Sequence, residues 1–252
     1  MRPIPDEYRQ PARAQGTVKK VTYGGKYALV YLPQGETDRI LYLIHGGGGN
    51  QESFFRPAFI HMVDHMIEQK ELAPLVIVSP TYYDPDETDK TPRGSGVAVA
   101  KFCGELRQEI LPAVEGYANL KPDRLHRAIS GFSMGGVTTW YAFLQALDLF
   151  YWFLPLSGDC WICGEKGGGE HPAETAEKLA QAVKAQGISQ YRIHAITGTK
   201  DIAYPNLDAQ IKAMRNYPGV FGEQMVYDTL EGGVHDYETI FRYLYNALPG
   251  VF

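Results

Sequence analysis

The sequence lacks the features that mark several common classes of protein. No stretch approaches the roughly 18 consecutive apolar residues of a membrane-spanning helix. The net charge is -5, and no basic stripe is interleaved with aromatic residues, so we expect neither nucleic acid nor membrane as a partner. Three cysteines, an odd number, argue against a disulfide framework, and we interpret them as free thiols.

The chain also lacks an apolar leader segment at its start. Met1–Asp6 contains no hydrophobic core of a signal peptide, which leaves two interpretations. The protein is either cytoplasmic, or secreted with a signal peptide that this sequence does not include. A length of 252 residues with 44% apolar residues is usual for α/β architectures, and we predict one domain over residues 1–252.

The most informative motif that is present is the pentapeptide GFSMG at Gly131–Gly135. A short apolar segment precedes it and a stretch with helical periodicity follows it, which predicts a strand, a tight turn and a helix. A serine at such a turn has its hydroxyl exposed above the sheet, and small neighbours are needed around it. The pattern predicts a nucleophile elbow at Ser133, whereas the alternative is an ordinary serine in a glycine-rich turn.

A nucleophilic serine needs a base, and the partners follow it in the order Ser, Asp or Glu, His in this kind of site. His235 lies in a loop between a predicted strand and a predicted helix near the end of the chain, where that base is expected. His61 and His65 share one helix face and could be two metal ligands, but no third ligand completes the motif. We therefore expect no metal.

The orienting acid is expected among five aspartates that follow the serine: Asp201 and Asp159, each at the end of a predicted strand, and Asp208, Asp228 and Asp236. Asp201 follows the strand Tyr191–Thr197, and Asp159 follows the strand Trp152–Leu156. We favour Asp201, at the carboxyl end of its strand, over Asp159, and we expect Asp236, which directly follows the histidine, to point elsewhere. Asp201 could instead cap a helix, but Pro205 already marks a separate helix start.

An oxyanion hole is predicted from a glycine run. The residues HGGGG at His45–Gly49 follow a buried strand, as in the corresponding loop of lipases and esterases. We expect the N–H of Met134, the residue after the nucleophile, to act with an N–H of Gly46 or Gly47. A phosphate loop is the alternative, but neither the Gly-Lys-Ser/Thr ending nor dinucleotide spacing is present.

Strands and helices alternate along the chain. Strands are predicted at 18–23, 27–32, 39–44, 75–79, 127–131, 152–156, 191–197 and 224–230, and helices at 53–70, 97–117, 134–147, 173–185, 206–216 and 237–247. A hairpin followed by alternating units predicts an α/β fold with a mostly parallel eight-stranded sheet and helices on both faces. Two long loops, 80–96 and 158–172, lie at strand ends where α/β enzymes hold substrate.

With these motifs the chain resembles carbohydrate esterase family one, and in particular the feruloyl esterase domains of bacterial multidomain xylanases. The matching segments are Leu43–Gly48, Ser79–Thr81, Gly131–Gly136, Asp201–Tyr204 and Gly233–His235, together with the loop Leu156–Trp161. The resemblance implies an α/β-hydrolase fold and a catalytic triad of Ser133, Asp201 and His235, and it places Asp159 and Trp161 beside the cleft rather than in the proton relay.

The function expected from this reading is hydrolysis of feruloyl esters on plant cell-wall polysaccharides such as arabinoxylan, without a cofactor. Trp161, Tyr82 and Tyr83 lie in the two long loops and could flank a flat phenolic ring, or could simply pack those loops. The alternatives are an acetylxylan esterase, an esterase for small thiol or siderophore esters, and a sugar-binding protein without activity. A complete Ser, Asp and His set disfavours the last.

Overall fold

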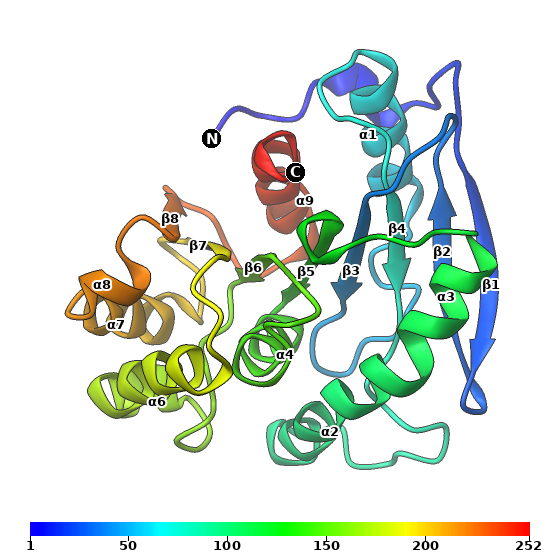
Figure 1. Ribbon diagram of the computed structural model, residues 1–252. Coiled ribbons are helices and arrows are strands. Elements are labelled where there is room, and N and C mark those ends of the chain that lie inside the picture. Colours follow the sequence, from blue (N-terminus) through cyan, green and yellow to red (C-terminus); the bar gives the residue numbers. More distant parts are fainter.

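A computed structural model describes residues 1–252, which form one eight-stranded sheet in the order β1-β2-β4-β3-β5-β6-β7-β8 (Figure 1). The strands are β1 (Thr17–Tyr23), β2 (Lys26–Leu32), β3 (Ile40–Ile44), β4 (Val76–Ser79), β5 (Arg127–Phe132), β6 (Trp152–Leu156), β7 (Arg192–Gly198) and β8 (Met225–Leu230). β2 runs antiparallel to both β1 and β4, and all other neighbours are parallel. The predicted α/β class and the eight-stranded sheet are confirmed.

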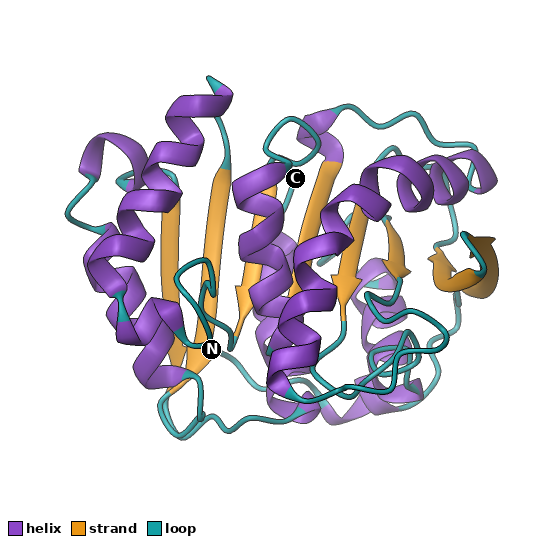
Figure 2. Cartoon of the chain, turned by 90° about the horizontal axis from the view of Figure 1, so that it is seen from below, coloured by secondary structure: helices purple, strands orange, loops and turns teal.

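Helices lie on both sides of the strands (Figure 2). They are α1 (Pro57–Glu68), α2 (Pro92–Glu105), α3 (Leu111–Tyr117), α4 (Met134–Gln145), α5 (Gly167–Glu170), α6 (Pro172–Gln186), α7 (Tyr204–Met214), α8 (Pro218–Phe221) and α9 (Tyr237–Ala247). A π-helical turn at 106–110 joins α2 to α3, and single 3-10 turns lie at 6–9, 124–126 and 248–250. None of these helices combines the length and apolar character that crossing a membrane requires.

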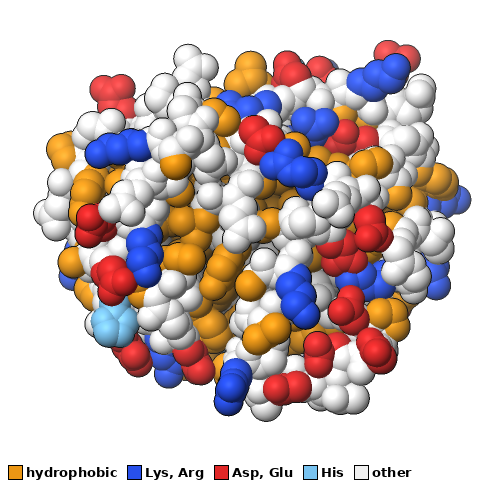
Figure 3. Space-filling model, turned by 60° about the horizontal axis from the view of Figure 1, so that its bottom comes forward, with side chains coloured by type: hydrophobic (Ala, Val, Ile, Leu, Met, Phe, Trp, Pro, Cys, Tyr) orange, Lys and Arg blue, Asp and Glu red, His pale blue; other side chains and the backbone are white.

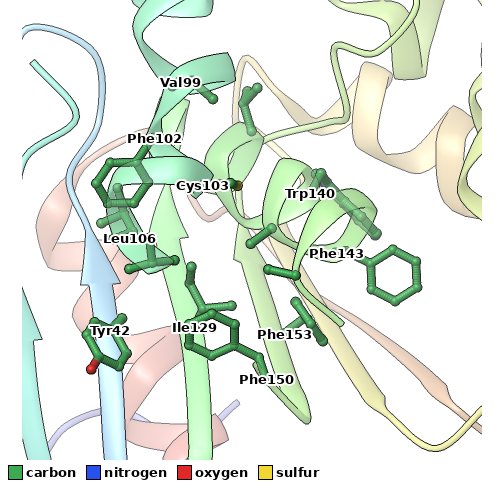
Figure 4. Packing of buried hydrophobic residues seen from close by; sticks show 14 of the residues in the cluster. Tyr42, Val99, Phe102, Cys103, Leu106, Ile129, Trp140, Phe143, Phe150 and Phe153 are labelled. Atoms are coloured by element: carbon green, nitrogen blue, oxygen red, sulfur yellow. The ribbon is translucent and has the colours of Figure 1, made fainter. Parts of the chain in front are cut away.

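The two faces of the sheet have separate hydrophobic cores, because successive side chains of a strand point to opposite faces. In β3, Tyr42 belongs to the core beneath α2, α4, α6 and α7, whereas Leu41 and Leu43 belong to the core beneath α1 and α9. Figure 4 shows the first core, where Phe102 of α2 and Phe143 of α4 lie over the strands. Burial on both faces explains why the central strands read as continuous apolar runs.

The helix starts differ from those expected from periodicity, and prolines account for the differences. α2 begins at Pro92 instead of residue 97, with the Thr91 hydroxyl accepting the Gly94 N–H at its N-terminus. α1 begins at Pro57 instead of residue 53, because a residue before proline is held in an extended conformation. Proline in the first turn of a helix costs no hydrogen bond, so it sets the start.

All six parallel strands end at one edge of the sheet, and in Figure 1 the arrowheads of β3 and β4 point down toward this edge. Figure 3 brings this edge forward and shows hydrophobic side chains in a hollow at its centre, with charged side chains around them. The loops that follow β3, β4, β5, β6 and β7 therefore meet at this edge, as in other open α/β sheets.

Candidate active site

Ser133 lies in the turn between β5 and α4 with a backbone conformation that side-chain-bearing residues rarely adopt. Its φ is 57° and its ψ is -115°, and its N–H donates to the Leu156 carbonyl at 2.9 Å. A Cβ on Gly131 would lie 2.4 Å from the Gly135 oxygen, and a Cβ on Gly135 would lie 2.0 Å from the Ile44 oxygen. Both glycines of the motif are therefore required by backbone contact, and the turn that they permit exposes the serine hydroxyl.

A continuous hydrogen-bonded chain joins Ser133 to two side chains from distant loops. His235 Nε2 lies 3.0 Å from Ser133 Oγ, and His235 Nδ1 lies 2.7 Å from Asp201 Oδ1. The Asp201 side chain is fully buried, and its Oδ1 also accepts the Ala203 N–H at 2.8 Å. Because a carboxylate only accepts, this contact places the histidine proton on Nδ1 and leaves Nε2 free to accept from the serine.

The loops that carry Asp201 and His235 are in backbone contact through two glycines. A Cβ on Gly198 would lie only 2.3 Å from the Gly233 oxygen. The Lys200 N–H donates to that same Gly233 carbonyl at 3.0 Å. The end of β7 and the turn after β8 are therefore packed as closely as two backbones allow, which fixes the spacing of the carboxylate and the imidazole.

The HGGGG loop lies directly against the nucleophile. A Cβ on Gly46 would lie 3.4 Å from Ser133 Cβ, and one on Gly47 would lie 3.2 Å from Met134 Cγ. The Gly46 N–H donates to the Tyr237 hydroxyl at 3.4 Å, whereas the Gly47 N–H has no hydrogen bond within the chain. Met134 is the first residue of α4, where helix N–H groups lack a partner in the helix.

The same loop is anchored by His45, which sequence reasoning treated only as part of the motif. His45 is fully buried, its Nε2 lies 2.8 Å from the Thr81 hydroxyl, and its ring packs on Tyr82 at 4.4 Å between centroids. Burial disfavours the charged imidazole and lowers the pKa of His45 to about 4. The Tyr83 hydroxyl accepts the Gly48 N–H at 3.0 Å, so a second side chain holds the loop.

A cavity of about 100 Å³ opens beside Ser133 and His235. Asp159 and Trp161, both predicted to lie beside the cleft, are among the residues that line it. Asp159 Oδ1 accepts the Trp161 indole N–H at 3.3 Å, and Asp159 Oδ2 accepts the Gly168 N–H at 3.0 Å. Burial raises the pKa of Asp159 to about 6, despite these hydrogen bonds.

Trp161 is half-buried, and hydrogen bonds hold both its side chain and its backbone. Its indole N–H is bound by Asp159, and its backbone carbonyl accepts the hydroxyl of Tyr141 from α4 at 3.2 Å. Ile202 also lines this cavity and is 76% exposed, although its side chain is large and apolar. Sequence reasoning missed Ile202, and its position directly after Asp201 was the available signal.

Tyr82 is a correction to the expectation from the sequence. It is 3% exposed, does not line the cavity beside Ser133, and packs instead on His45 and against Phe102 of α2. His61 and His65, considered as metal ligands, lie within hydrogen-bond distance of the backbone carbonyls of the N-terminal segment. No group of three or more His, Cys, Asp or Glu side chains in the chain is arranged to hold a metal ion.

The chain matches known proteins over most of its length. Residues 25–248 match the family described as "Putative esterase". The chain is 35% identical over its whole length to endo-1,4-beta-xylanase Y of Acetivibrio thermocellus and 30% identical over 69% of its length to an endo-1,4-beta-xylanase/feruloyl esterase of Xylanibacter ruminicola. It spans only about a quarter of each of these relatives, 24% and 27%.

Solved structures extend the likeness to a whole module. An alanine mutant of the feruloyl esterase module from Clostridium thermocellum, complexed with sinapinate, is 34% identical with a TM-score of 0.86 over all of this chain and 93% of that one. A ferulic acid esterase from Anaeromyces mucronatus, complexed with ferulic acid, is 19% identical over 98% of this chain and 96% of that one, and its TM-score of 0.76 shows a shared fold. This chain belongs to the esterase family, and its likeness to carbohydrate esterase family one is confirmed.

Proposed function

We propose that this protein is a serine esterase that hydrolyses hydroxycinnamoyl esters, such as feruloyl groups on arabinoxylan. The observation that carries the proposal is the hydrogen-bonded chain from Asp201 through His235 to Ser133 at a strained turn. This arrangement is the one that activates a serine hydroxyl for acyl transfer. The choice of a hydroxycinnamoyl acyl group rests on the likeness to a feruloyl esterase module of similar sequence and length, whose structure holds sinapinate.

The reaction proceeds in two balanced steps. Ser133 Oγ attacks the ester carbonyl carbon while its proton passes to His235 Nε2, and Asp201 stabilises the imidazolium that forms. Collapse of the tetrahedral intermediate breaks the carbon–oxygen bond, and the alcohol leaves with the proton from His235. Water then attacks the acyl-enzyme with His235 again as base, which releases the carboxylic acid and restores the serine.

The oxyanion of each tetrahedral intermediate is assigned to two backbone donors. Met134 N–H supplies one, because it begins a helix and adjoins the nucleophile. Gly47 N–H supplies the other, since it is unbonded in the free protein, whereas Gly46 N–H already faces the Tyr237 hydroxyl. Such donors contribute about 2.7–4 kcal/mol each to stabilising the transition state in serine hydrolases.

Trp161 and Ile202 are assigned to the acyl group. The indole and the exposed isoleucine side chain both line the cavity and offer apolar surfaces to a flat phenolic ring. Asp159 fixes the indole and does not take part in the proton relay. Tyr82 has no part in this proposal, because it is buried away from the cavity.

A second candidate function is cleavage of acetyl esters, as in an acetylxylan esterase. The observation that favours it is the cavity volume of about 100 Å³, which encloses a small acyl group completely but a phenolic acyl group only in part. Hydrolysis of a feruloyl ester therefore requires the aromatic ring of the feruloyl group to extend past Trp161 toward solvent.

The test compares hydrolysis of methyl ferulate and p-nitrophenyl acetate by the purified protein, with Ser133→Ala as the blank for each. Methyl acetate is measured in the same way, and a kcat/KM for methyl ferulate at least tenfold above that for methyl acetate supports the first function. Hydrolysis of p-nitrophenyl acetate without hydrolysis of methyl ferulate favours the second function. If neither ester shows turnover that depends on Ser133, both functions are contradicted.

A further inference from the structure

A second cavity, of about 250 Å³, opens at the same edge of the sheet. Its walls come from the turn between β1 and β2, the loop after β4, and the residues Gly49–Gln51 at the end of the HGGGG loop. The volume lies slightly below the roughly 300–1,000 Å³ of pockets for drug-sized ligands, so a smaller ligand is expected.

The sheet order places this cavity across the nucleophile from Trp161. Ser133 follows β5 near the middle of the sheet, and Trp161 follows β6 on one side of it. The second cavity lies over β2, β4 and β3 on the other side. Gly49, in its wall, is three residues after Gly46, which touches Ser133, and three residues of chain span at most about 10 Å.

An ester has two arms that leave the carbonyl carbon in different directions. If the acyl arm lies against Trp161, as the proposed function holds, the alcohol arm extends past the HGGGG loop toward the second cavity. The two cavities therefore correspond to the two products of the reaction, the acid and the alcohol. The polar and charged side chains that line the second cavity therefore indicate which alcohol binds there.

The most telling side chain in the second cavity is Gln51. It is only 8% exposed, yet its amide forms no hydrogen bond with any atom of the chain. The amide atoms of Gln51 are not among the unpaired side-chain atoms that are shut off from water, so the amide reaches the solvent in the cavity and is free to bind a ligand there. A glutamine amide donates two hydrogen bonds and accepts through its oxygen, which matches a pair of neighbouring hydroxyl groups.

Charges of both signs line the same cavity as Gln51. Lys26 is buried and pairs with Asp84 at 3.3 Å, whereas the ammonium of Lys90 lies 5.1 Å from the Tyr83 ring centre and forms no ion pair. A phosphate or carboxylate ligand would lie close to the Asp84 carboxylate, and a cation would lie close to the two lysines. Donors and acceptors mixed at short range favour a neutral polyol.

We propose that this cavity is a subsite for the sugar that carries the ester, with Gln51 as its specificity-determining residue and Lys90 as a second donor. The proposal rests on the proposed function for the direction of the two ester arms. It predicts that the protein distinguishes a feruloylated pentose of a polysaccharide from a feruloyl ester of a simple alcohol, although the acyl group is the same.

The first test measures kcat/KM on feruloyl-arabinosyl xylo-oligosaccharide and on methyl ferulate. Gln51→Ala is expected to lower the value for the oligosaccharide ester about tenfold, mostly through KM, which is the effect of losing one or two neutral hydrogen bonds. Lys90→Ala is expected to lower it several-fold. Both changes should alter the value for methyl ferulate by less than about twofold, because methanol does not reach the cavity.

Two exposed side chains of the same types serve as matched controls. Gln108→Ala and Lys184→Ala remove them at positions that line neither the second cavity nor the one beside Ser133. They should leave both esters unaffected. Equal losses on both esters with Gln51→Ala, or no loss on either, would overturn the sugar subsite.

A second measurement separates this proposal from the proposed function. Ser133→Ala protein is titrated with the ester-free arabinosyl xylo-oligosaccharide, and binding is followed by calorimetry with and without Gln51→Ala. Saturable binding that Gln51→Ala weakens supports the subsite even if the wild-type protein hydrolyses neither ester, a result that contradicts only the proposed function. Absence of binding, or binding that Gln51→Ala does not change, contradicts the subsite.

Discussion

Two buried aspartates at neighbouring strand ends show how similar surroundings give different chemistry. Asp159 follows β6 and Asp201 follows β7, and they are 3% and 4% exposed. Each accepts an aromatic N–H and a backbone N–H. The aromatic partner differs, since Asp201 binds the imidazole of His235 and Asp159 binds the indole of Trp161.

The identity of the ring decides what each carboxylate can do. An imidazole gains and loses a proton near neutral pH, so a carboxylate beside it stabilises the charge that appears during catalysis. An indole only donates a hydrogen bond, so the carboxylate beside it fixes the ring but stabilises no charge on it. Burial and strand position alone therefore do not identify a catalytic acid. The bonded partner does.

The comparison of Asp159 with Asp201 assumes that Ser133 is the nucleophile. The substitution with the largest expected effect tests this assumption. Ser133→Ala should lower kcat for the preferred ester by about five to six orders of magnitude, because members of a triad act as a unit. Steady-state kinetics on methyl ferulate give the rate, and circular dichroism checks that the fold is unchanged. A variant that kept a tenth of wild-type turnover would exclude Ser133 as the nucleophile.

Exchanging the two acids for amides separates them directly. Asp201→Asn should lower kcat by about three to four orders of magnitude, because an amide favours the wrong tautomer of His235. Asp159→Asn should change kcat by less than about tenfold and act mainly on KM through the position of Trp161. The two variants are compared on one ester at one pH. If Asp159→Asn were the inactive variant, the roles would be reversed.

A third buried ionisable group at a strand end, His45 after β3, extends the comparison of the two aspartates from catalysis to stability. Its pKa is lowered from 6.5 to about 4, so between these values the unfolded chain binds more protons than the folded protein. The stability that neutral His45 provides is therefore complete above pH 6.5 and is lost as the pH falls toward 4.

We expect a variant without this group to lose less stability in acid. Between pH 7.5 and pH 5, the unfolding free energy of the wild type should fall by up to about 2 kcal/mol more than that of His45→Gln. Urea titrations at several pH values measure the difference, and shifts from other groups cancel in it. Parallel pH curves for the two proteins would show that His45 is not the group responsible.

The smallest expected effect concerns the ring that Asp159 holds. Trp161→Ala should reduce kcat/KM for methyl ferulate several-fold more than for a short acetyl ester, since an aromatic contact is worth about 1 kcal/mol. Tyr82→Ala is the useful contrast, because Tyr82 is buried beneath the HGGGG loop and its loss should weaken both reactions. Equal losses on both esters with Trp161→Ala would contradict an aromatic acyl pocket.

Much of the fold, and the meeting of Ser133, Asp201 and His235, could be inferred from sequence because the signals are local. Each candidate residue stands at the end of an apolar run, and parallel strands place such ends at a common edge. The chain order of Ser133, Asp201 and His235 then left few alternatives. The helix starts were less accurate, although Thr91 before Pro92 was a readable signal for the start of α2.

What could not be inferred depends on contacts between distant segments. Tyr82 and Tyr83 are adjacent in a loop, yet one packs on His45 and the other binds the Gly48 N–H. Gln51 reads as an ordinary polar residue after a glycine run, and only the hairpin turn before β2 and the loop after β4 enclose it in a cavity. Neither periodicity nor composition contains that information.

The contact between Gly198 and Gly233 has a consequence for how this site could be altered. The separation of acid and base is set by two main chains with no side chain between them, so no substitution at these positions lengthens it gradually. Any added Cβ would push the two loops apart in one step. Redesign for another ester would therefore leave the relay untouched and vary the walls around it, where single side chains can be exchanged one at a time.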